Sequence, residues 1–446
     1  MLIIVIDVRK GQRVRYRYWR AWPLIVCSLM CYVLTGAVSS IVNVASVLYE
    51  AERGWDATLL TGAMSIASFI NVLAGYVAGR MASRRSVKPM CLVWGALFVV
   101  GVITMGASPN AGIFIVAMCV ANAASSALGY NTMPVLITRW FPTKKGTVQG
   151  FASMGILLGS TSSALYVWAY RSLGPSLATI PFAAFAFIAL VLLMISVSDW
   201  PEQKGFEPDT MERVDSSHAA PAAQCDEGDA AALTSAQDAP NTNEVRQFLS
   251  HPAFVALTLI LGIQLVYAGG IMVQLVPRLI EVGFSLDEST FIMMFASLLA
   301  CVGSFAAGVI GDRYGAKAGV CLTFVLGALG VVLNLVPNEL VSILGVVCIG
   351  CVVGSADNWP VNICAELFDR TMFSRVFGVM FPTIQLVGAV GPALVAWITE
   401  MSGGYQAAYI MLGVLMAAGA IAFPPLMDFI KNRDCPNNPK NARGSG

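Results

Sequence analysis

Apolar runs of roughly 20 residues, the length an α-helix needs to cross a bilayer core, recur along most of the chain. Runs this long and without alternation form helices, because lipid offers the backbone no water and a barrel strand would alternate. With 57% hydrophobic and 12% charged residues, the chain also has too little polar surface for a water-soluble globule. We count twelve spans, which begin near Trp22, Thr58, Val87, Ala111, Gly146, Leu177, Pro252, Ser289, Ala318, Leu340, Val376 and Ala407.

A charged, glycine-containing loop occurs twice, after the second span and after the eighth. The copies comprise Gly75, Arg80, Arg84 and Arg85, then Gly308, Asp312, Arg313, Gly315 and Lys317. Gly75 and Gly308 stand 233 residues apart (308 minus 75). Repetition at half the chain length predicts two pseudo-symmetric six-helix bundles with a solute site between them. We expect both copies to latch one membrane face, with cations paired to a carboxylate and to helix C-termini.

Basic residues mark alternate loops and predict the orientation. Only Arg53, Arg171 and Arg278 fall on the side opposite the other cations, so the positive-inside rule places both termini in the cytoplasm, and we assign no cleaved signal. The predicted domains are an amino-terminal bundle with a basic leader (1–197), an acidic flexible loop (198–250), a second bundle (251–430) and a cytoplasmic tail (431–446). The loop is too polar to fold, and it is either an inert tether or a docking site for a regulatory partner.

Signatures of other functions are missing from the sequence. It has no Walker loop, no G-x-S-x-G and no basic patch with interleaved aromatics, which argues against an enzyme and against nucleic-acid binding. Cys348 and Cys351 form a C-x-x-C, but inside an apolar run and with only two histidines in the chain, so we expect no metal and no cofactor. We expect a monomer in the lipid bilayer that binds a small organic solute, with a coupled proton or a counter-substrate.

Two shorter patterns extend the repeat. Ser285 and Glu288 form a capping box at the start of the eighth span. At the equivalent place, Asp56 can cap the start of the second span. A third echo joins two sets of residues in the fourth and tenth spans and the segments after them, namely Asn131, Pro134, Phe141 and Gly150, and Asn358, Pro360, Phe368 and Gly378.

The loop G-x-x-x-D-R-x-G-x-K, present as Gly308 to Lys317, resembles the signature of the major facilitator superfamily. In the first copy Gly79 replaces the Asp and Ala82 the second Gly. Gly54-Trp55 and the segment Arg139-Trp140-Phe141-Pro142, followed by Lys144, Lys145 and Gly146, resemble the oxalate/formate antiporter and monocarboxylate transporter branch. This resemblance implies the major facilitator fold, an all-α membrane protein of twelve helices in two bundles, with alternating access and carboxylate substrates.

Polar side chains at mid-depth are candidates for the solute site. The fourth and tenth spans supply aromatic and amide groups, which can stack on a planar solute and hydrogen-bond its edges. The resemblance adds residues of the first, seventh and eleventh spans, because these spans face the central cavity in the superfamily. For any one of these residues, a hydrogen bond between helices is the alternative to ligand contact. The candidates are Asn43, Tyr130, Asn131, Gln264, Tyr267, Gln274, Asn358, Trp359 and Gln385.

The charges of the carboxyl-terminal half depart from the branch. No Lys or Arg occurs between Arg278 and Arg313 or between Arg375 and Lys431, so the cations expected on the eighth and eleventh spans are missing. Ser304 and the pair Ile384-Gln385 stand at those places. An anion without a counter-charge in a low-dielectric cavity costs several kcal/mol. The substrate is therefore a mono- or dicarboxylate by resemblance, held by amide, hydroxyl and backbone donors, or it is neutral, zwitterionic or cationic. Of the latter, we place a neutral or aromatic solute first. A transporter-like sensor that binds without flux is a rival, and a membrane enzyme a distant third.

Two further hypotheses concern charged residues in or near the membrane. Asp357 on the tenth span costs ~3 kcal/mol as a carboxylate unless it gains a proton or a partner. It is either a proton-coupling residue or a latch to Arg139 or Arg375. At the opposite face, Arg278 can meet Glu50 or Glu52 as an outer gate, or it is an interfacial arginine that extends to the headgroups.

Overall fold

The computed structural model describes residues 4–6, 13–15, 21–55, 57–84, 86–204, 212–213, 252–368 and 370–434. Most of the predicted acidic loop and basic leader, the predicted cap Asp56 and the residues after 434 lie outside these ranges, so those predictions stay open.

The first six spans form one bundle, and two of them are interrupted. The fourth is divided by a π-helical turn, and the fifth bends by 44° at residues 161–162. The elements are α1 (Trp22–Arg53), α2 (Ala57–Arg84), α3 (Val87–Gly106), α4 (Ala111–Ser126), the π-helix η2 (Ala127–Thr132), α5 (Met133–Trp140), α6 (Lys145–Ser160), α7 (Ser163–Leu173), α8 (Ile180–Ser196) and the short 3₁₀ turn η3 (Pro201–Lys204).

The last six spans form the second bundle. The capping box of Ser285 and Glu288 is present, as predicted, at the start of α12. The elements are α11 (Pro252–Val282), α12 (Leu286–Tyr314), α13 (Ala316–Leu335), α14 (Glu339–Ser355), α15 (Asn358–Leu367), α16 (Arg370–Gly388), α17 (Gly391–Ser402) and α18 (Tyr405–Asp434).

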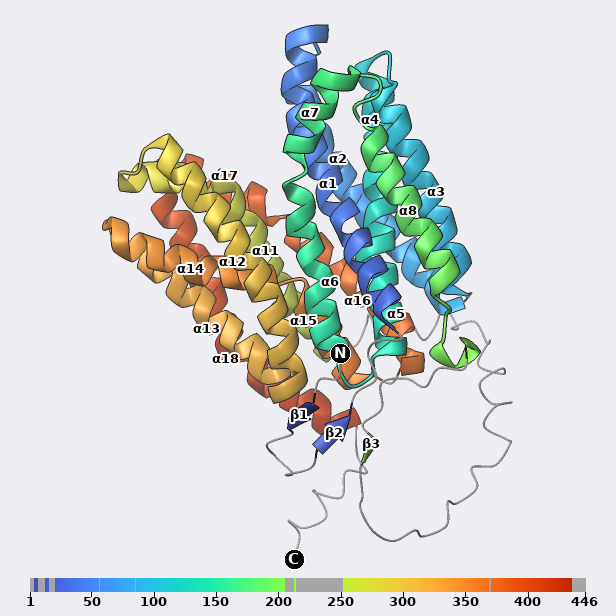
Figure 1. The fold of residues 1–446 in the computed structure, drawn as a ribbon. Helices are drawn as coiled ribbons and strands as arrows, with labels where there is room; N and C mark the ends of the chain where they lie inside the picture. The colour runs from blue at the N-terminus through green and yellow to red at the C-terminus, as the bar shows by residue number, and fades with distance from the viewer. Residues whose placement is uncertain are drawn as a thin grey trace, which may run out of the picture.

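Three very short strands lie below the bundles in Figure 1, near the chain ends. They are β1 (Ile4–Ile6), β2 (Arg13–Arg15) and β3 (Glu212–Arg213), antiparallel in the order β1-β2-β3. Arg15 pairs with Ile4 on one side and with Glu212 on the other. The basic N-terminal segment, through β2, therefore pairs with β3 in the segment that connects the two bundles.

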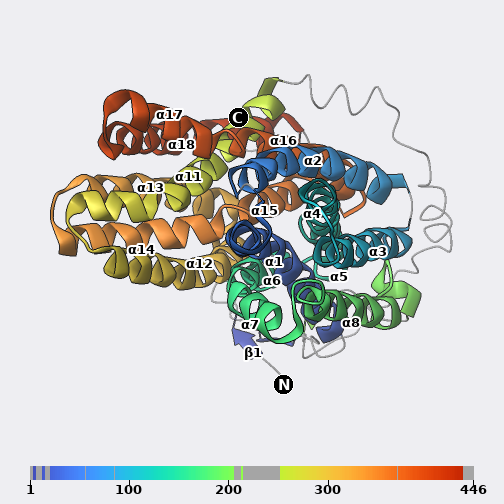
Figure 2. The ribbon, with the colours of Figure 1, turned by 90° about the horizontal axis from the view of Figure 1, so that it is seen from above.

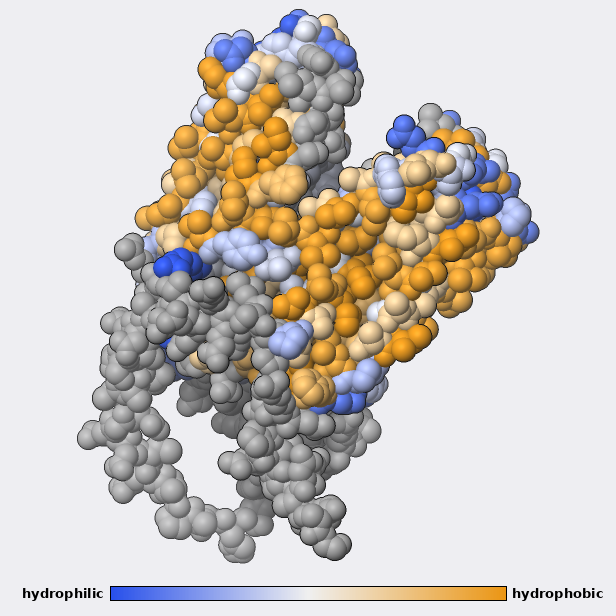
Figure 3. All heavy atoms as spheres, turned by 180° about the vertical axis from the view of Figure 1, so that it is seen from behind, coloured by the Kyte–Doolittle hydropathy of each residue, from blue (hydrophilic) through white to orange (hydrophobic). Residues whose placement is uncertain are grey.

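The helices have the length and surface of membrane spans. Among the described residues, eight helices are long and apolar enough to cross a bilayer, and ten if each of two bent pairs is one span. Two shorter apolar helices, Ile66–Ala82 and Ile180–Ser196, fall where the second and sixth spans were predicted. Apolar side chains cover the flanks of both bundles in Figure 3. The prediction of an all-helical membrane protein is confirmed.

The two bundles form a V (Figure 1). They touch at the end where α1 begins and α18 ends, which we call the closed end, and a cleft separates them at the other, as Figure 3 shows. Two helix pairs make most of the contact, α6 with α12 and α2 with α16 (Figure 2). The repeat exchanges these pairs, since it relates the second span to the eighth and the fifth to the eleventh.

Glycine allows both pairs to pack backbone to backbone. A Cβ at Gly308 would lie 2.1 Å from the carbonyl oxygen of Gly146, and one at Gly79 would lie 2.3 Å from the Cα of Gly378. Both distances are far below van der Waals contact, so only glycine fits there. Gly308, one of the repeated glycines, lies in this backbone contact.

Candidate functional site

The fourth and tenth spans are interrupted at equivalent places, where the sequence repeats Asn131 and Asn358. The first interruption is η2, and the second is the turn at 356–357, where α14 and α15 meet at 49°. Proline explains both. Pro134 has no N–H to donate to the carbonyl of residue 130, and Pro360 has none for residue 356. Such π-helical turns are frequent at functional sites.

The two interruptions bring Tyr130 and Asp357 together across the interface between the bundles. The Tyr130 hydroxyl and the Asp357 carboxyl are hydrogen-bonded. Both residues are partly exposed, whereas Asn131 and Asn358 beside them are buried. The Tyr130–Asp357 pair is therefore the part of the two interruptions that a solute can reach.

Two aromatic rings flank the Tyr130 ring. Tyr32 of α1 meets it edge-on with centroids 5.8 Å apart, and Phe381 of α16 lies 5.6 Å away. The Tyr32 hydroxyl accepts a hydrogen bond of 2.6 Å from the Gln149 amide, whose own oxygen is buried without a partner. Tyr32, Gln149 and Phe381 were not predicted. Their one signal in the sequence is a polar or aromatic side chain within an apolar run, too common to select them.

Asp357 is the one residue of this cluster that carries a charge when ionised, and the charge is negative. Desolvation and the Tyr130 hydrogen bond are the described influences on Asp357, and neither Asp357 nor Tyr130 has an Arg or Lys among its described interactions. The predicted latch from Asp357 to Arg139 or Arg375 is therefore not formed in this conformation. Arg139 instead stacks on Trp200, 4.7 Å from the ring centroid.

Three predicted site residues serve packing rather than the cleft. Asn358 is buried in hydrogen bonds with Ser153 and Ser304. Trp359 is buried against Gly319, at whose Cβ position its ring lies 2.1 Å away. Tyr267 is buried and donates to the carbonyl of Gly327 at 3.1 Å, a bond within the second bundle. In this conformation these side chains hold helices together, which was the alternative for each.

Other predicted residues hold unsatisfied amides. Both amide atoms of the buried Gln264, the Asn131 oxygen and the Gln385 oxygen have no partner in the described structure. Gln385 lies one helical turn beyond Phe381, on the same face of α16, and is partly exposed. Gln274 is also partly exposed on α11. Asn43 lies in α1, but its side chain is outside the described part.

The second copy of the charged loop closes the α6–α12 contact. Asp312 accepts hydrogen bonds from the backbone N–H groups of Gly146 (2.9 Å) and Thr147 (2.6 Å) and from the Thr147 hydroxyl (2.6 Å). This contact of a carboxylate with a helix N-terminus was not among the predicted ones, which paired the cations of the loop with a carboxylate and with helix C-termini. Unpaired N–H groups and the positive end of the helix dipole favour an anion at a helix N-terminus.

The other charged-loop residues lie around this latch. Lys317 pairs with Asp428 at 2.6 Å, Arg313 stacks on Tyr314 at 5.5 Å, and Gly315 adopts φ +88° between α12 and α13. In the first copy, Gly75 packs against Pro382 and Asn131, while Arg80 is exposed. The side chains of Arg84 and Arg85 are outside the described residues.

Comparison with known proteins assigns this architecture. The sequence profile of the Major Facilitator Superfamily matches residues 28–392 and 281–443. The chain belongs to the Major Facilitator Superfamily. It is 21% identical to monocarboxylate transporter 12 of Rattus norvegicus over 413 residues, covering 90% of this chain and 84% of that protein. A match to the Mus musculus protein of the same name is 26% identical over 190 residues, 41% of this chain and 38% of that protein.

Solved structures of the superfamily share the fold. The Escherichia coli fucose:proton symporter FucP aligns with a TM-score of 0.68 at 12% identity, over 93% of this chain and 99% of that one. The proton:xylose symporter XylE aligns at 0.67 and 11%, over 90% and 94%. The human organic anion transporter MFSD10 aligns at 0.66 and 15%, over 91% and 99%. Superfamily membership makes the chain a secondary transporter of a small solute, not an enzyme.

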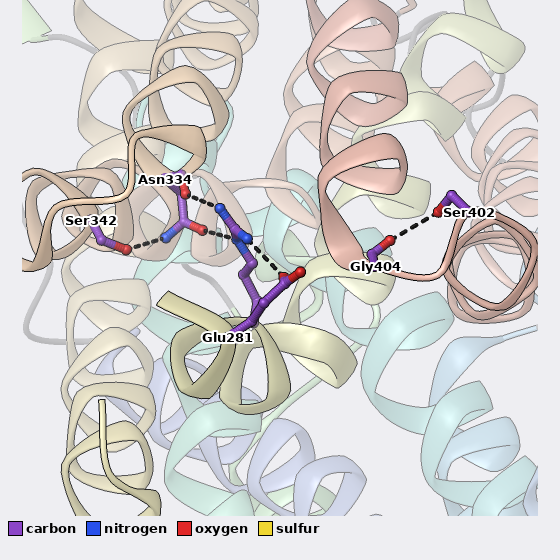
Figure 4. A network of polar contacts seen from close by, with 6 residues as sticks. Glu281, Asn334, Ser342, Ser402 and Gly404 are labelled. Atoms are coloured by element: carbon purple, nitrogen blue, oxygen red, sulfur yellow. Dashed lines mark hydrogen bonds and ion pairs between the residues drawn. The ribbon is translucent and has the colours of Figure 1, made fainter. Parts of the chain in front are cut away.

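Two of the three predicted outer-gate residues, Arg278 and Glu52, bond to residues of their own bundles. The buried Arg278 pairs with Glu281 at 2.7 Å and donates to the Asn334 carbonyl at 2.9 Å; Figure 4 shows Glu281, Asn334 and Ser342 in this network. Glu52 accepts a 2.6 Å hydrogen bond from Tyr170, and Glu50 is exposed. The bundles are apart at this end, so an Arg278 gate is not formed in this conformation.

Proposed function

We propose that this superfamily member carries a small monocarboxylate together with a proton, and that Asp357 carries the proton. Its site is the cluster of Tyr32, Tyr130, Asp357 and Phe381, where the cleft ends between the bundles. The partly exposed Tyr130–Asp357 pair, which has no described cation partner, is the observation on which the proposal rests.

Repulsion between two negative charges is the reason that the proposal includes a proton. The empty site holds one negative charge when Asp357 is ionised. A monocarboxylate entering beside it would add a second negative charge with no cation to offset it, at a cost of several kcal/mol. If Asp357 takes a proton, the loaded site again holds one negative charge. The net charge of the site is then the same whether the transporter changes conformation loaded or empty.

The same reasoning favours monocarboxylates over dicarboxylates, which would add one more uncompensated charge. The monocarboxylate transporter 12 relatives support this choice through their name. Neutral donors near the site can bind the carboxylate, including the exposed part of Gln385 and the hydroxyl of Tyr130.

For the location, we propose the cytoplasmic membrane with both termini in the cytoplasm, as the positive-inside rule indicates. The closed end then faces the cytoplasm, and the structure is an outward-facing state. In this orientation an inward proton gradient loads Asp357 from outside.

Uptake into liposomes tests the proposal. Purified protein is reconstituted, an inward proton gradient is imposed, and labelled lactate, benzoate, succinate and benzamide are compared. We expect uptake of a monocarboxylate that is driven by the proton gradient. Asp357→Asn should lose this driven uptake but should still exchange internal for external monocarboxylate when the pH is equal on both sides of the membrane. Asp428→Asn, an exposed acid paired with Lys317, is the matched control. Proton-driven accumulation retained by Asp357→Asn would exclude Asp357 as the proton carrier.

A neutral aromatic solute is the second candidate. The three rings of Tyr32, Tyr130 and Phe381 favour it, because aromatic faces can stack on a planar solute without any counter-charge. Uptake of benzamide but of neither lactate nor benzoate would select this candidate. Saturable binding of any of these probes without flux would instead indicate a sensor.

A further inference from the structure

We propose that Asn358 links the state of Asp357 to the closure of the α6–α12 contact, so that loading the site loosens the closed end. This inference rests on the proposed role of Asp357 and adds the route by which the site reaches the contact. Asn358 is then a positioning residue rather than a ligand of the solute.

The three polar side chains of this link form a closed network between the bundles. The Ser153 hydroxyl of α6 donates to the Asn358 side-chain oxygen at 2.7 Å. The Asn358 amide donates to the Ser304 hydroxyl oxygen at 3.0 Å and to the Ser304 carbonyl at 3.1 Å. The Ser304 hydroxyl lies 2.9 Å from the Gly150 carbonyl across the interface.

All three side chains are buried, with exposures of 3% for Ser153, 1% for Ser304 and 0% for Asn358. The Ser153 hydroxyl also lies within hydrogen-bond distance of the Gln149 and Gly150 carbonyls of its own helix, and the Asn358 amide bonds to Ser304 in its own bundle. The contacts that require α6 to lie against α12 are those of Ser153 with Asn358 and Ser304, and of Ser304 with Gly150. When the bundles separate here, the Ser153–Asn358 and Ser304–Gly150 bonds must break. The network therefore stabilises the closed arrangement specifically, and a buried group that loses its partner costs more than an exposed one.

The neighbouring residue provides the coupling. Asp357 bonds to Tyr130 on the fourth span, and Asn358 bonds to Ser153 on the fifth. Both bonds leave from one turn of chain between α14 and α15 and end on the other bundle. Because both bonds are made from the same turn, the Asp357–Tyr130 bond helps to hold Asn358 where it can reach Ser153, and the Asn358–Ser153 bond helps to hold Asp357 where it can reach Tyr130. Protonation of Asp357 removes a charge-assisted bond and relaxes the turn that places Asn358.

Hydrogen–deuterium exchange of the purified full-length protein tests this link without any solute. The readout is the exchange rate of peptides from α6 and from the closed-end half of α12. We expect Asn358→Ala to raise these rates on the order of tenfold, since buried hydrogen bonds are lost. Ser355→Ala is the control: Ser355 is equally buried but bonds only within its own helix, to Val352. Its rates should stay unchanged.

The decisive measurement is a double-mutant cycle. Asp357→Asn should speed exchange at the α6–α12 contact in the wild-type background but add nothing in the Asn358→Ala background. Equal factors in both backgrounds, or rates in Asn358→Ala no higher than in Ser355→Ala, would overturn the inference. Should Asn358→Ala fail to fold, Ser153→Ala removes the α6 side of the same bond.

The outcomes separate this inference from the proposed function. Absence of monocarboxylate uptake would refute the proposed solute and leave the exchange cycle untouched. Additive exchange factors would refute the link and leave proton-driven uptake by Asp357 standing.

Discussion

Replacement of Asp312 by alanine should open the closed end. Asp312 receives three hydrogen bonds of 2.6 to 2.9 Å from Gly146 and Thr147 at the N-terminus of α6, two of them from backbone N–H groups. These bonds cross from one bundle to the other, so they exist only in the closed arrangement. The substitution should therefore shift the conformational equilibrium rather than unfold either bundle.

The expected magnitude follows from the kinds of bond that are lost. A helix N-cap contributes ~1 kcal/mol, a carboxylate at the dipole ~0.3–1 kcal/mol, and a hydrogen bond to a charged group ~1.5–3 kcal/mol. Water replaces part of these when the contact opens, which leaves roughly 2–4 kcal/mol. At 1.4 kcal/mol per factor of ten, the open population should rise about 30- to 1000-fold.

Lys145 provides a native probe for this opening. Its amine, on α6, donates to the carbonyl of Ala365 in the second bundle. Labelling by an amine reagent, followed by mass spectrometry, should therefore accelerate at Lys145 when the bundles part. Asp428→Asn is the control, because it breaks a pair whose acid is 59% exposed and whose contribution is small. Labelling of Lys145 in Asp312→Ala within twofold of the unchanged protein would refute the reasoning.

Three further predictions concern other contacts. Gly79→Ala should destabilise the closed end by ~1–3 kcal/mol through overpacking, whereas Gly112→Ala, whose Cβ meets nothing nearer than 3.5 Å, should not; equal Lys145 labelling in both would contradict this. Tyr130→Phe keeps the ring and loses the hydroxyl beside Asp357, so proton-driven uptake should fall by about tenfold; unchanged uptake would count against the site. Arg278→Met should lower stability by ~2–4 kcal/mol, because Glu281 and Asn334 lose a buried partner; thermal unfolding within error of wild type would contradict it.

Much of the fold could be predicted because lipid leaves few solutions for an apolar chain. Span length identified the helices, and the repeat indicated that the second and eighth spans play matching roles. Starts differed where polar residues extend a helix beyond the apolar run, as at α16, which begins at Arg370 rather than near Val376. The echo at Asn131 and Asn358 falls at the two interruptions, but the sequence analysis predicted neither the interruptions nor their bends.

The site was predicted only in part, because hydropathy does not tell which face of a span meets which neighbour. Asp357 and Tyr130 were both candidates, yet their contact depends on two turns that only the folded backbone reveals. Asn358 and Tyr267 were predicted to line the site, and in this conformation their side chains bond to neighbouring helices. Gln149 and Tyr32 were missed, since their bond joins helices separated by 117 residues.

The replacement of the first-copy aspartate by Gly79 gives the two closing contacts different sensitivities. The α6–α12 side is fastened by a carboxylate, so acid that neutralises Asp312 weakens it. The α2–α16 side rests on the bare approach of Gly79 to Gly378 and on the bond between the Tyr76 and Thr383 hydroxyls, which carry no charge. Two contacts related by the same repeat therefore differ in chemistry: one depends on an ionised carboxylate and the other on uncharged packing and a hydroxyl–hydroxyl bond. Only the first should respond to acid.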